Sequence, residues 1–95
     1  MAEEEVSLES RVAIGGEVVS RDLEGEAIIL NLKSGTYFGL DSVGTRIWSL
    51  LQEDGSLRRT FELLEQEYDV EPERCERDLM ALLEGLLGAG LIEVR

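Results

Sequence analysis

The spacing of apolar residues divides the chain into a β-rich first half and a helical second half. Two runs of β-branched and aliphatic residues, Glu17–Leu23 and Glu26–Leu32, flank the short step Glu24–Gly25, which is typical of a hairpin turn. A second turn at Lys33–Gly35 leads into the short run Thr36–Leu40. The first half is therefore predicted to form a three-strand antiparallel meander whose short third strand lies at an edge.

Three helical patterns follow the strands. The first helix opens at Asp41–Ser42 and the second after Ser56, because Asp and Ser are good N-terminal caps. The third begins near Glu71–Pro72, where proline is tolerated in the first turn, and ends before Gly88 and Gly90. Apolar residues recur at i, i+3, i+4 and i+7 in each segment, which gives each helix one apolar face.

This order of elements predicts an α+β domain with a three-stranded antiparallel sheet followed by three helices. A short second helix, a tight turn and a longer third helix are typical of a winged helix-turn-helix, with the strands as a wing-like sheet. Leu91–Val94 is a candidate closing strand. Residues 1–16, which open with the acidic letters MAEEE, are predicted to form a flexible acidic N-terminal segment, and residues 17–95 a single domain.

The composition argues against catalysis. The chain has no histidine and a single cysteine, Cys75, so it offers no imidazole base, no histidine-activated nucleophile and no set of transition-metal ligands. Cys75 lies on an apolar helix face, which favours a core role. We therefore predict that the protein is not an enzyme and needs no metal or other cofactor.

The charge balance adds a prediction about partners. Nine basic and 21 acidic residues give a formal net charge of −12, which repels nucleic acid and favours a cationic partner. The helix that would enter a DNA groove carries Glu71, Glu73, Glu76, Asp78 and Glu84 against only Arg74 and Arg77. No apolar run approaches the roughly 20 residues of a membrane helix, and no export signal is recognisable. We expect a cytoplasmic protein that binds neither nucleic acid nor membrane.

The third predicted helix has an unusual second face beside its apolar one. On a helical projection this second arc holds Arg74, Arg77, Asp78, Ala81, Gly85 and Gly88. Glycine inside a helix is unfavourable by about 1 kcal/mol relative to alanine, so Gly85 invites a reason. Either another part of the same chain packs closely there or Gly85 is simply tolerated, or else a shallow groove receives a foreign backbone.

The predicted edge strand favours the second interpretation. Alternation places Phe38 and Leu40 on one face, as core residues, and Tyr37 and Gly39 on the other. Within the strand there is no charge, proline or bulge of the kind that usually protects an edge. Such an edge is either an aggregation risk or a docking site for a peptide that adds a strand. Self-pairing in a homodimer is the alternative to a monomer that binds a peptide.

Several motifs together resemble a known family. They are YFGL (Tyr37–Leu40), GTRIW (Gly44–Trp48), EYDV (Glu67–Val70), ERDL (Glu76–Leu79) and GLIEV (Gly90–Val94), in an order and spacing that span Val18–Val94. The chain resembles the family of the pyrroloquinoline-quinone biosynthesis protein D, also called the precursor-peptide recognition element. Within that family it looks most like the stand-alone recognition proteins of lasso-peptide clusters.

The resemblance implies a winged helix-turn-helix that binds the leader segment of a ribosomally made precursor peptide, by strand addition in the cleft against the third helix. The implied peptide-binding residues are Thr36, Tyr37, Phe38, Gly39, Leu40, Arg74, Arg77, Asp78, Ala81, Leu82 and Gly85. We expect Tyr37, Phe38 and Leu82 to form apolar walls and Asp78 to pair with a cationic leader residue. The implied partner is a separate cysteine-type leader peptidase. The alternative is a radical or other modifying enzyme of quinone-cofactor or other peptide maturation.

Overall fold

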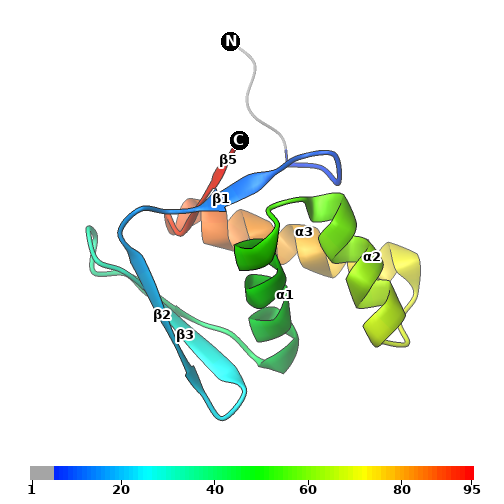
Figure 1. Cartoon of the computed structure of the whole chain (residues 1–95), viewed down its shortest axis with the longest axis horizontal. Helices are drawn as coiled ribbons and strands as arrows, with labels where there is room; N and C mark the ends of the chain where they lie inside the picture. The colour runs from blue at the N-terminus through cyan, green and yellow to red at the C-terminus, as the bar shows by residue number, and fades with distance from the viewer. Residues whose placement is uncertain (1–5) are drawn as a thin grey trace.

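The predicted three-strand meander is confirmed by the computed structural model, which describes residues 6–95 (Figure 1). Its strands are β2 (Val18–Leu23), β3 (Glu26–Asn31) and β4 (Tyr37–Gly39), in the order β2-β3-β4 and antiparallel throughout. Glu24 and Gly25 both have positive φ, 57° and 84°. Two such residues form the turn whose twist matches that of the flanking strands, so the Glu24–Gly25 turn sets the β2–β3 register.

Three helices follow the sheet, as predicted. They are α1 (Ser42–Glu53), α2 (Leu57–Glu67) and α3 (Pro72–Gly88). The Asp41 carboxylate accepts a hydrogen bond from the Gly44 N–H at 2.8 Å, and the Ser56 hydroxyl accepts one from the Arg59 N–H at 3.3 Å. Both contacts satisfy N–H groups that a helix leaves unpaired in its first turn. Helix α3 begins with Pro72, whose missing N–H would have had no partner there.

One face of the sheet, here called the inner face, packs against α1 and closes the core. Ala27 and Ile29 on β3 are 4% and 0% exposed. They meet α1 residues such as Ile47 and Trp48, which are also buried. The Thr45 hydroxyl accepts a hydrogen bond from the Ala27 N–H at 2.7 Å, and this bond fixes α1 to the end of the sheet. The opposite face of the sheet is called the outer face.

The N-terminal part of the chain differs from the prediction. Strand β1 (Val12–Ile14) pairs antiparallel with β5 (Ile92–Val94), and Val12 is only 2% exposed. Residues 12–14 therefore belong to the folded domain rather than to a flexible segment ending at residue 16. The closing strand predicted at Leu91–Val94 is confirmed as β5. The letters MAEEE lie outside the described residues.

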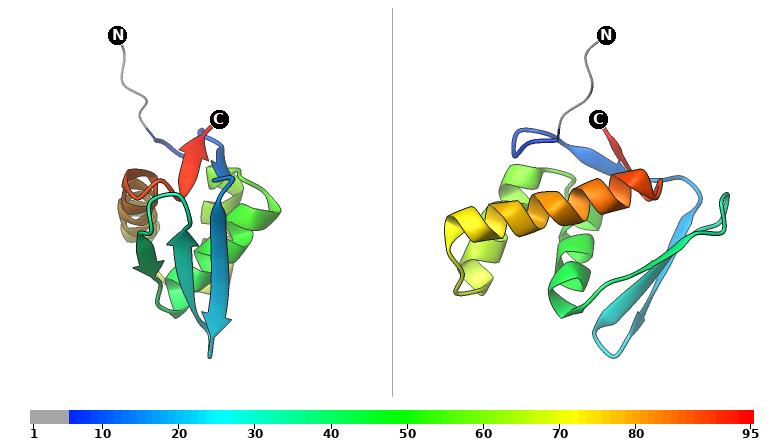
Figure 2. Two further views of the ribbon diagram at one scale, coloured as in Figure 1. Left: turned by 90° about the vertical axis from the view of Figure 1, so that its left-hand side faces the viewer. Right: turned by 180° about the vertical axis from the view of Figure 1, so that it is seen from behind.

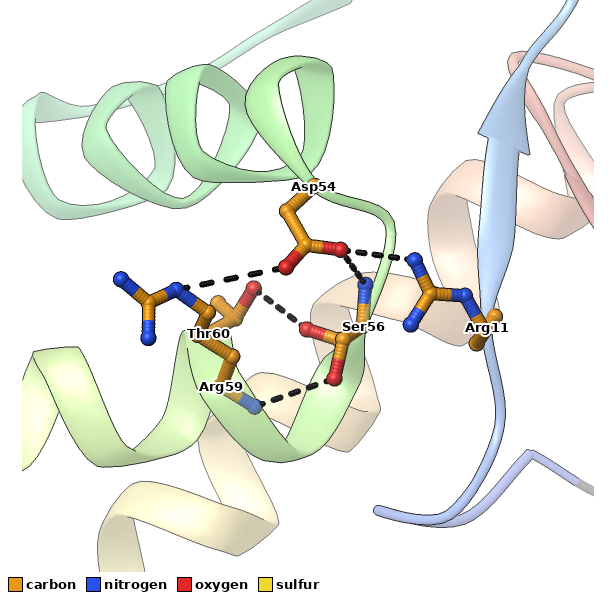
Figure 3. A network of polar contacts seen from close by, with 5 residues as sticks. All are labelled: Arg11, Asp54, Ser56, Arg59 and Thr60. Atoms are coloured by element: carbon orange, nitrogen blue, oxygen red, sulfur yellow. Dashed lines mark hydrogen bonds and ion pairs between the residues drawn. The ribbon is translucent and has the colours of Figure 1, made fainter.

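A close backbone crossing holds β1 against the α1–α2 turn. The Val12 N–H donates to the Gly55 carbonyl at 2.9 Å, and a Cβ on Gly55 would lie 1.9 Å from the Val12 oxygen. Beside this crossing the Asp54 carboxylate pairs with Arg11 at 2.8 Å and lies 4.0 Å from Arg59 (Figure 3). Only glycine permits this approach of two backbones, so residue 55 ties the N-terminal strand to the helices.

An ion pair joins α1 to the end of α2. Arg46 donates through Nε and Nη2 to the two carboxylate oxygens of Glu67, at 2.9 and 2.7 Å. This hydrogen bond is the main reason that the pKa of Glu67 is lowered and that of Arg46 raised. A lowered carboxyl pKa stabilises the fold above the unfolded pKa, and the contribution is lost as the pH falls through the folded pKa.

We expect Arg46→Gln to return the pKa of Glu67 to its usual range, because the bidentate donor is gone. The pKa is measured by following the Glu67 side-chain carboxyl carbon by NMR as the pH is lowered. Arg77→Gln, which removes an equal charge from α3, is the matched control and should leave the Glu67 titration unchanged. Identical Glu67 titrations in the Arg46 variant and the unmodified protein would contradict the ion pair.

The cleft between the edge strand and the third helix

Strand β4 has β3 on one side, and within residues 6–95 no strand pairs with its other side. Two hydrogen bonds fix how it is attached. The Asn31 N–H donates to the Thr36 carbonyl and the Leu40 N–H to the Ala27 carbonyl, each at 2.8 Å. These bonds flank β4 and set the phase of the hydrogen-bonding ladder.

The alternation of an antiparallel ladder then assigns the backbone groups between those bonds. Phe38, which pairs with Ile29, directs its N–H and C=O toward β3. Tyr37 and Gly39 direct theirs away from the sheet, into the open edge. The predicted edge strand therefore offers two N–H and two C=O groups to an incoming chain.

The side chains of β4 alternate as the sequence predicts. Tyr37 is 73% exposed on the outer face, whereas Leu40 is 6% exposed and Phe38 half-buried on the inner side. Tyr37 thus lies away from the wall that it was expected to form with Phe38 and Leu82. Phe38 remains in the position expected of it.

Phe38 connects the edge strand to α3 by packing on Gly85. A Cβ on Gly85 would lie 3.3 Å from Cζ of the Phe38 ring. At Gly85 the second face of α3 is therefore packed closely by another part of the same chain, which was one of the interpretations of this face. In the left view of Figure 2 the end of α3 lies beyond the β4 edge of the sheet. The open side of β4 is thus bordered by a helix.

A hollow of about 430 Å³ lies in this border region and is here called the β4–α3 hollow. Its lining residues are Phe38, Gly39 and Leu40 from the edge strand, the cap residue Asp41, Val43, Gly44 and Ile47 from α1, and Asp78 and Leu82 from α3. The walls are mostly apolar. The Asp78 carboxylate adds a negative charge on one side, so the hollow suits an apolar side chain with a cation nearby.

A second hollow, of about 330 Å³, adjoins the first because Val43, Ile47 and Asp78 line both. It extends along the N-terminal half of α3 and reaches Cys75. Burial raises the pKa of the Cys75 thiol, and the charges of Glu65 and Asp78 raise it further. The thiol therefore stays protonated near neutral pH and is a poor nucleophile, in line with the predicted core role.

Asp78 already has one partner in its own chain. Its carboxylate lies 3.8 Å from the guanidinium of Arg74, one helical turn earlier, and the two side chains are 69% and 70% exposed. Exposed pairs of this kind contribute about 0–1 kcal/mol. The pair holds Asp78 only weakly, so a cation on a ligand can replace Arg74.

The structure brings together only part of the predicted site. Thr36 and Tyr37 lie along the open edge, outside both hollows. The exposed α3 residues Arg77 and Ala81 do not line either hollow. The α1 residues Val43 and Ile47 line both hollows, although neither was among the predicted site residues. Val43 is in fact 41% exposed, and its position in the first turn of α1, directly after β4, is the signal that could have placed it there.

Two further observations limit the chemistry of the described chain. Among residues 6–95 there is no group of three or more His, Cys, Asp or Glu side chains placed to hold a metal ion. None of the helices in that part of the chain is long and apolar enough to span a membrane.

An antiparallel wing-like sheet with an open edge beside the last helix defines a recognisable class of small domain. A family model for coenzyme PQQ synthesis protein D (PqqD) matches residues 26–92. The chain belongs to the PqqD family, and the resemblance drawn from the sequence motifs is thereby confirmed. No curated protein sequence matches the chain significantly.

Two solved structures share the fold. TbiB1, solved in complex with the TbiA(β) leader peptide, is 42% identical with a TM-score of 0.80, over 84% of this chain and 93% of TbiB1. Lasso peptide synthetase B1, solved with its leader peptide, is 25% identical with a TM-score of 0.78, over 87% of this chain and 98% of that protein. Both relatives are therefore small proteins of nearly the same extent that bind a leader peptide.

Proposed function

We propose that this protein binds the leader segment of a ribosomally synthesised precursor peptide, as an added strand on the open edge of β4. The observation that carries the proposal is that edge, whose free backbone groups lie beside the β4–α3 hollow. Membership of the PqqD family and the leader peptides bound by TbiB1 and lasso peptide synthetase B1 support it.

The backbone of the leader supplies register and part of the affinity. The outward N–H and C=O groups of Tyr37 and Gly39 can form hydrogen bonds to the leader, each worth roughly 0.5–1.5 kcal/mol net. These bonds place few demands on leader sequence. Selectivity must therefore come from side chains that enter pockets on either side of the added strand.

The inner side of the added strand selects an apolar residue. A leader residue beside Phe38 shares the face of Phe38 and enters the β4–α3 hollow, where Leu82 and Ile47 supply apolar contacts. A basic leader residue nearby can pair with Asp78 in place of Arg74. The net charge of −12 speeds the encounter with a basic leader, and salt screening slows that encounter.

Binding then serves to present the leader to a separate enzyme. The described site contains no activated nucleophile, so a distinct cysteine-type leader peptidase would act on the held precursor in lasso-peptide biosynthesis. The similarity to lasso peptide synthetase B1 favours this pathway over the alternative of a radical enzyme in quinone-cofactor maturation. A short precursor gene beside genes for a peptidase and a cyclase would support the lasso assignment, and a neighbouring radical enzyme would overturn it.

The proposed function is tested by NMR titration of the isotope-labelled protein. The peptides are the leader segments of short reading frames beside the gene, together with the TbiA(β) leader. We expect amide shifts in residues 36–40 and 74–85, with the largest changes at Tyr37 and Gly39, whose N–H groups face the edge. Shifts confined to other surfaces, or no binding by any of these leaders, would overturn the proposal.

The charge of Asp78 should affect affinity for a basic leader. We expect Asp78→Asn to weaken binding by about three- to tenfold at low salt, because one attractive charge is removed from the hollow. Fluorescence anisotropy with a labelled leader measures the effect, which should shrink at high salt. Glu84→Gln changes the charge of the same helix equally but does not line the hollow. An equal loss in both variants would show that only overall charge matters.

A further inference from the structure

The outer face of the sheet carries several exposed large apolar side chains beside the charged residues Arg21 and Glu26. Its exposed large side chains are Val19, Leu23, Ile28 and Tyr37, with Leu32 directly after β3, at 48%, 52%, 43%, 73% and 57% exposure. The register places Ile28 opposite Gly39 and Leu30 opposite Tyr37, so these pairs share this face. Isolated exposed apolar residues are ordinary, but here they gather on one side of one small sheet.

A hollow interrupts this apolar face at the edge strand. It measures about 360 Å³, and Leu23, Ile28 and Gly39 are among its lining residues. A Cβ on Gly39 would meet no heavy atom within 4 Å. The hollow is therefore open above Gly39, directly beside the backbone groups that Gly39 directs into the open edge.

Gly39 differs in this respect from other glycines of the same region. At Gly85 the space is filled by Phe38, and at Gly44 an added Cβ would lie 3.2 Å from the Leu40 side chain. Those two glycines are explained by the packing of their own chain. No described residue packs where the side chain of residue 39 would be, so the chain's own packing does not account for Gly39.

Glycine in a strand exposes backbone and weakens the sheet, and it often marks a place where another chain approaches. In antiparallel sheets an aromatic side chain on the neighbouring strand can fold over such a glycine and compensate. One neighbour of Gly39 is Ile28 on β3. The other side is the open edge, where the neighbouring strand must come from a different molecule.

We propose that the leader carries a bulky apolar residue, preferably aromatic, at the position beside Gly39, and that its side chain covers this outer hollow. The inference rests on the proposed strand addition and specifies its substrate. The side chain packs over Gly39 and against Ile28 and Leu23. Because side chains alternate along a strand, the next leader residue, beside Phe38, enters the β4–α3 hollow. Recognition therefore needs two consecutive large residues that point to opposite faces.

A selection experiment tests this substrate preference. Short random peptides are displayed and selected separately on the unmodified protein and on the Gly39→Leu variant. Each selected peptide is then tested by NMR, and only peptides that shift the amide signals of β4 are analysed further. On the unmodified protein we expect enrichment of Trp, Tyr, Phe or Leu at the position beside Gly39. On Gly39→Leu, whose side chain fills the hollow, that preference should change to Gly, Ala or Ser, with the preference beside Phe38 unchanged.

The affinity of one selected peptide for a set of variants then tests whether its residue beside Gly39 contacts Ile28. Ile28→Ser should weaken binding about tenfold, and it should have little effect on a peptide that carries Ala beside Gly39. Val19→Ser removes a similarly exposed side chain from the same face outside the hollow and should leave both affinities unchanged. Thermal unfolding verifies that each variant is folded.

The two proposals fail in different ways. Peptides that shift the β4 amides but show no size preference beside Gly39, or the same preference on Gly39→Leu, would overturn only the inference about the outer hollow. Selected peptides that never shift the β4 amides would overturn strand addition, and this inference with it.

Discussion

Replacing Tyr37 with proline is expected to weaken leader binding by about 30-fold or more while the domain stays folded. The Tyr37 N–H faces the open edge, so proline removes a donor that the proposed added strand would use, and its ring would obstruct that strand. Proline is tolerated on edge strands when the lost N–H faces solvent. Calorimetric titration with a bound leader measures the loss, and thermal unfolding verifies the fold.

The opposite edge of the sheet supplies a matched control. The Leu32 N–H donates to the Glu17 carbonyl at 2.8 Å, which sets the ladder so that Ser20 on β2 directs its N–H away from β3. Ser20→Pro therefore makes the same change on an edge that the proposal leaves unused, and leader affinity should be retained. Full affinity in Tyr37→Pro, or an equal loss in both variants, would contradict binding at β4.

The second large effect is on stability. Gly55→Ala is expected to reduce the free energy of unfolding by about 3 kcal/mol or more, because the new Cβ would lie 1.9 Å from the Val12 carbonyl oxygen. The clash involves two backbones, so no change of rotamer relieves it. A loss of this size lowers the Tm of a domain of this length by roughly 12 °C or more. Denaturant and thermal unfolding measure both quantities.

Gly16→Ala is the control for this substitution. Gly16 has no heavy atom within 4 Å of an added Cβ, so the free energy of unfolding should change by less than about 0.5 kcal/mol. If Gly55→Ala were equally harmless, β1 would not be held against the α1–α2 turn. The pair of variants therefore tests whether residues 12–14 are part of the folded domain.

Local signals in the sequence were enough to predict most of the fold. The turn at Glu24–Gly25 and the caps at Asp41 and Ser56 act over a few residues, and each lies where the structure has it. Alternation in Thr36–Leu40 likewise predicted which side chains turn inward. These features depend on neighbours in the chain, so they are readable without knowledge of tertiary contacts.

Features that depend on distant parts of the chain could not be predicted in the same way. Strand β1 has three residues, too few for a clear alternation, and its partner β5 lies at the other end of the sequence. The second face of α3 has small residues around Gly85, but the sequence does not show which group occupies the space beside them. In the structure that group is the Phe38 ring from the sheet. Val43 was not among the predicted site residues, because helical spacing alone does not reveal the hollow beside β4.

The pairing of β1 with β5 determines how this domain can be joined to other proteins. Val12 lies opposite Val94, so the described chain arrives and departs at neighbouring points, on the side of the molecule away from the β2–β3 turn (Figure 1). A tether attached at either terminus would leave the β2-β3-β4 sheet unobstructed. Under the proposed function, a fusion partner at either end of the described chain would therefore leave the open edge of β4 free to bind a leader.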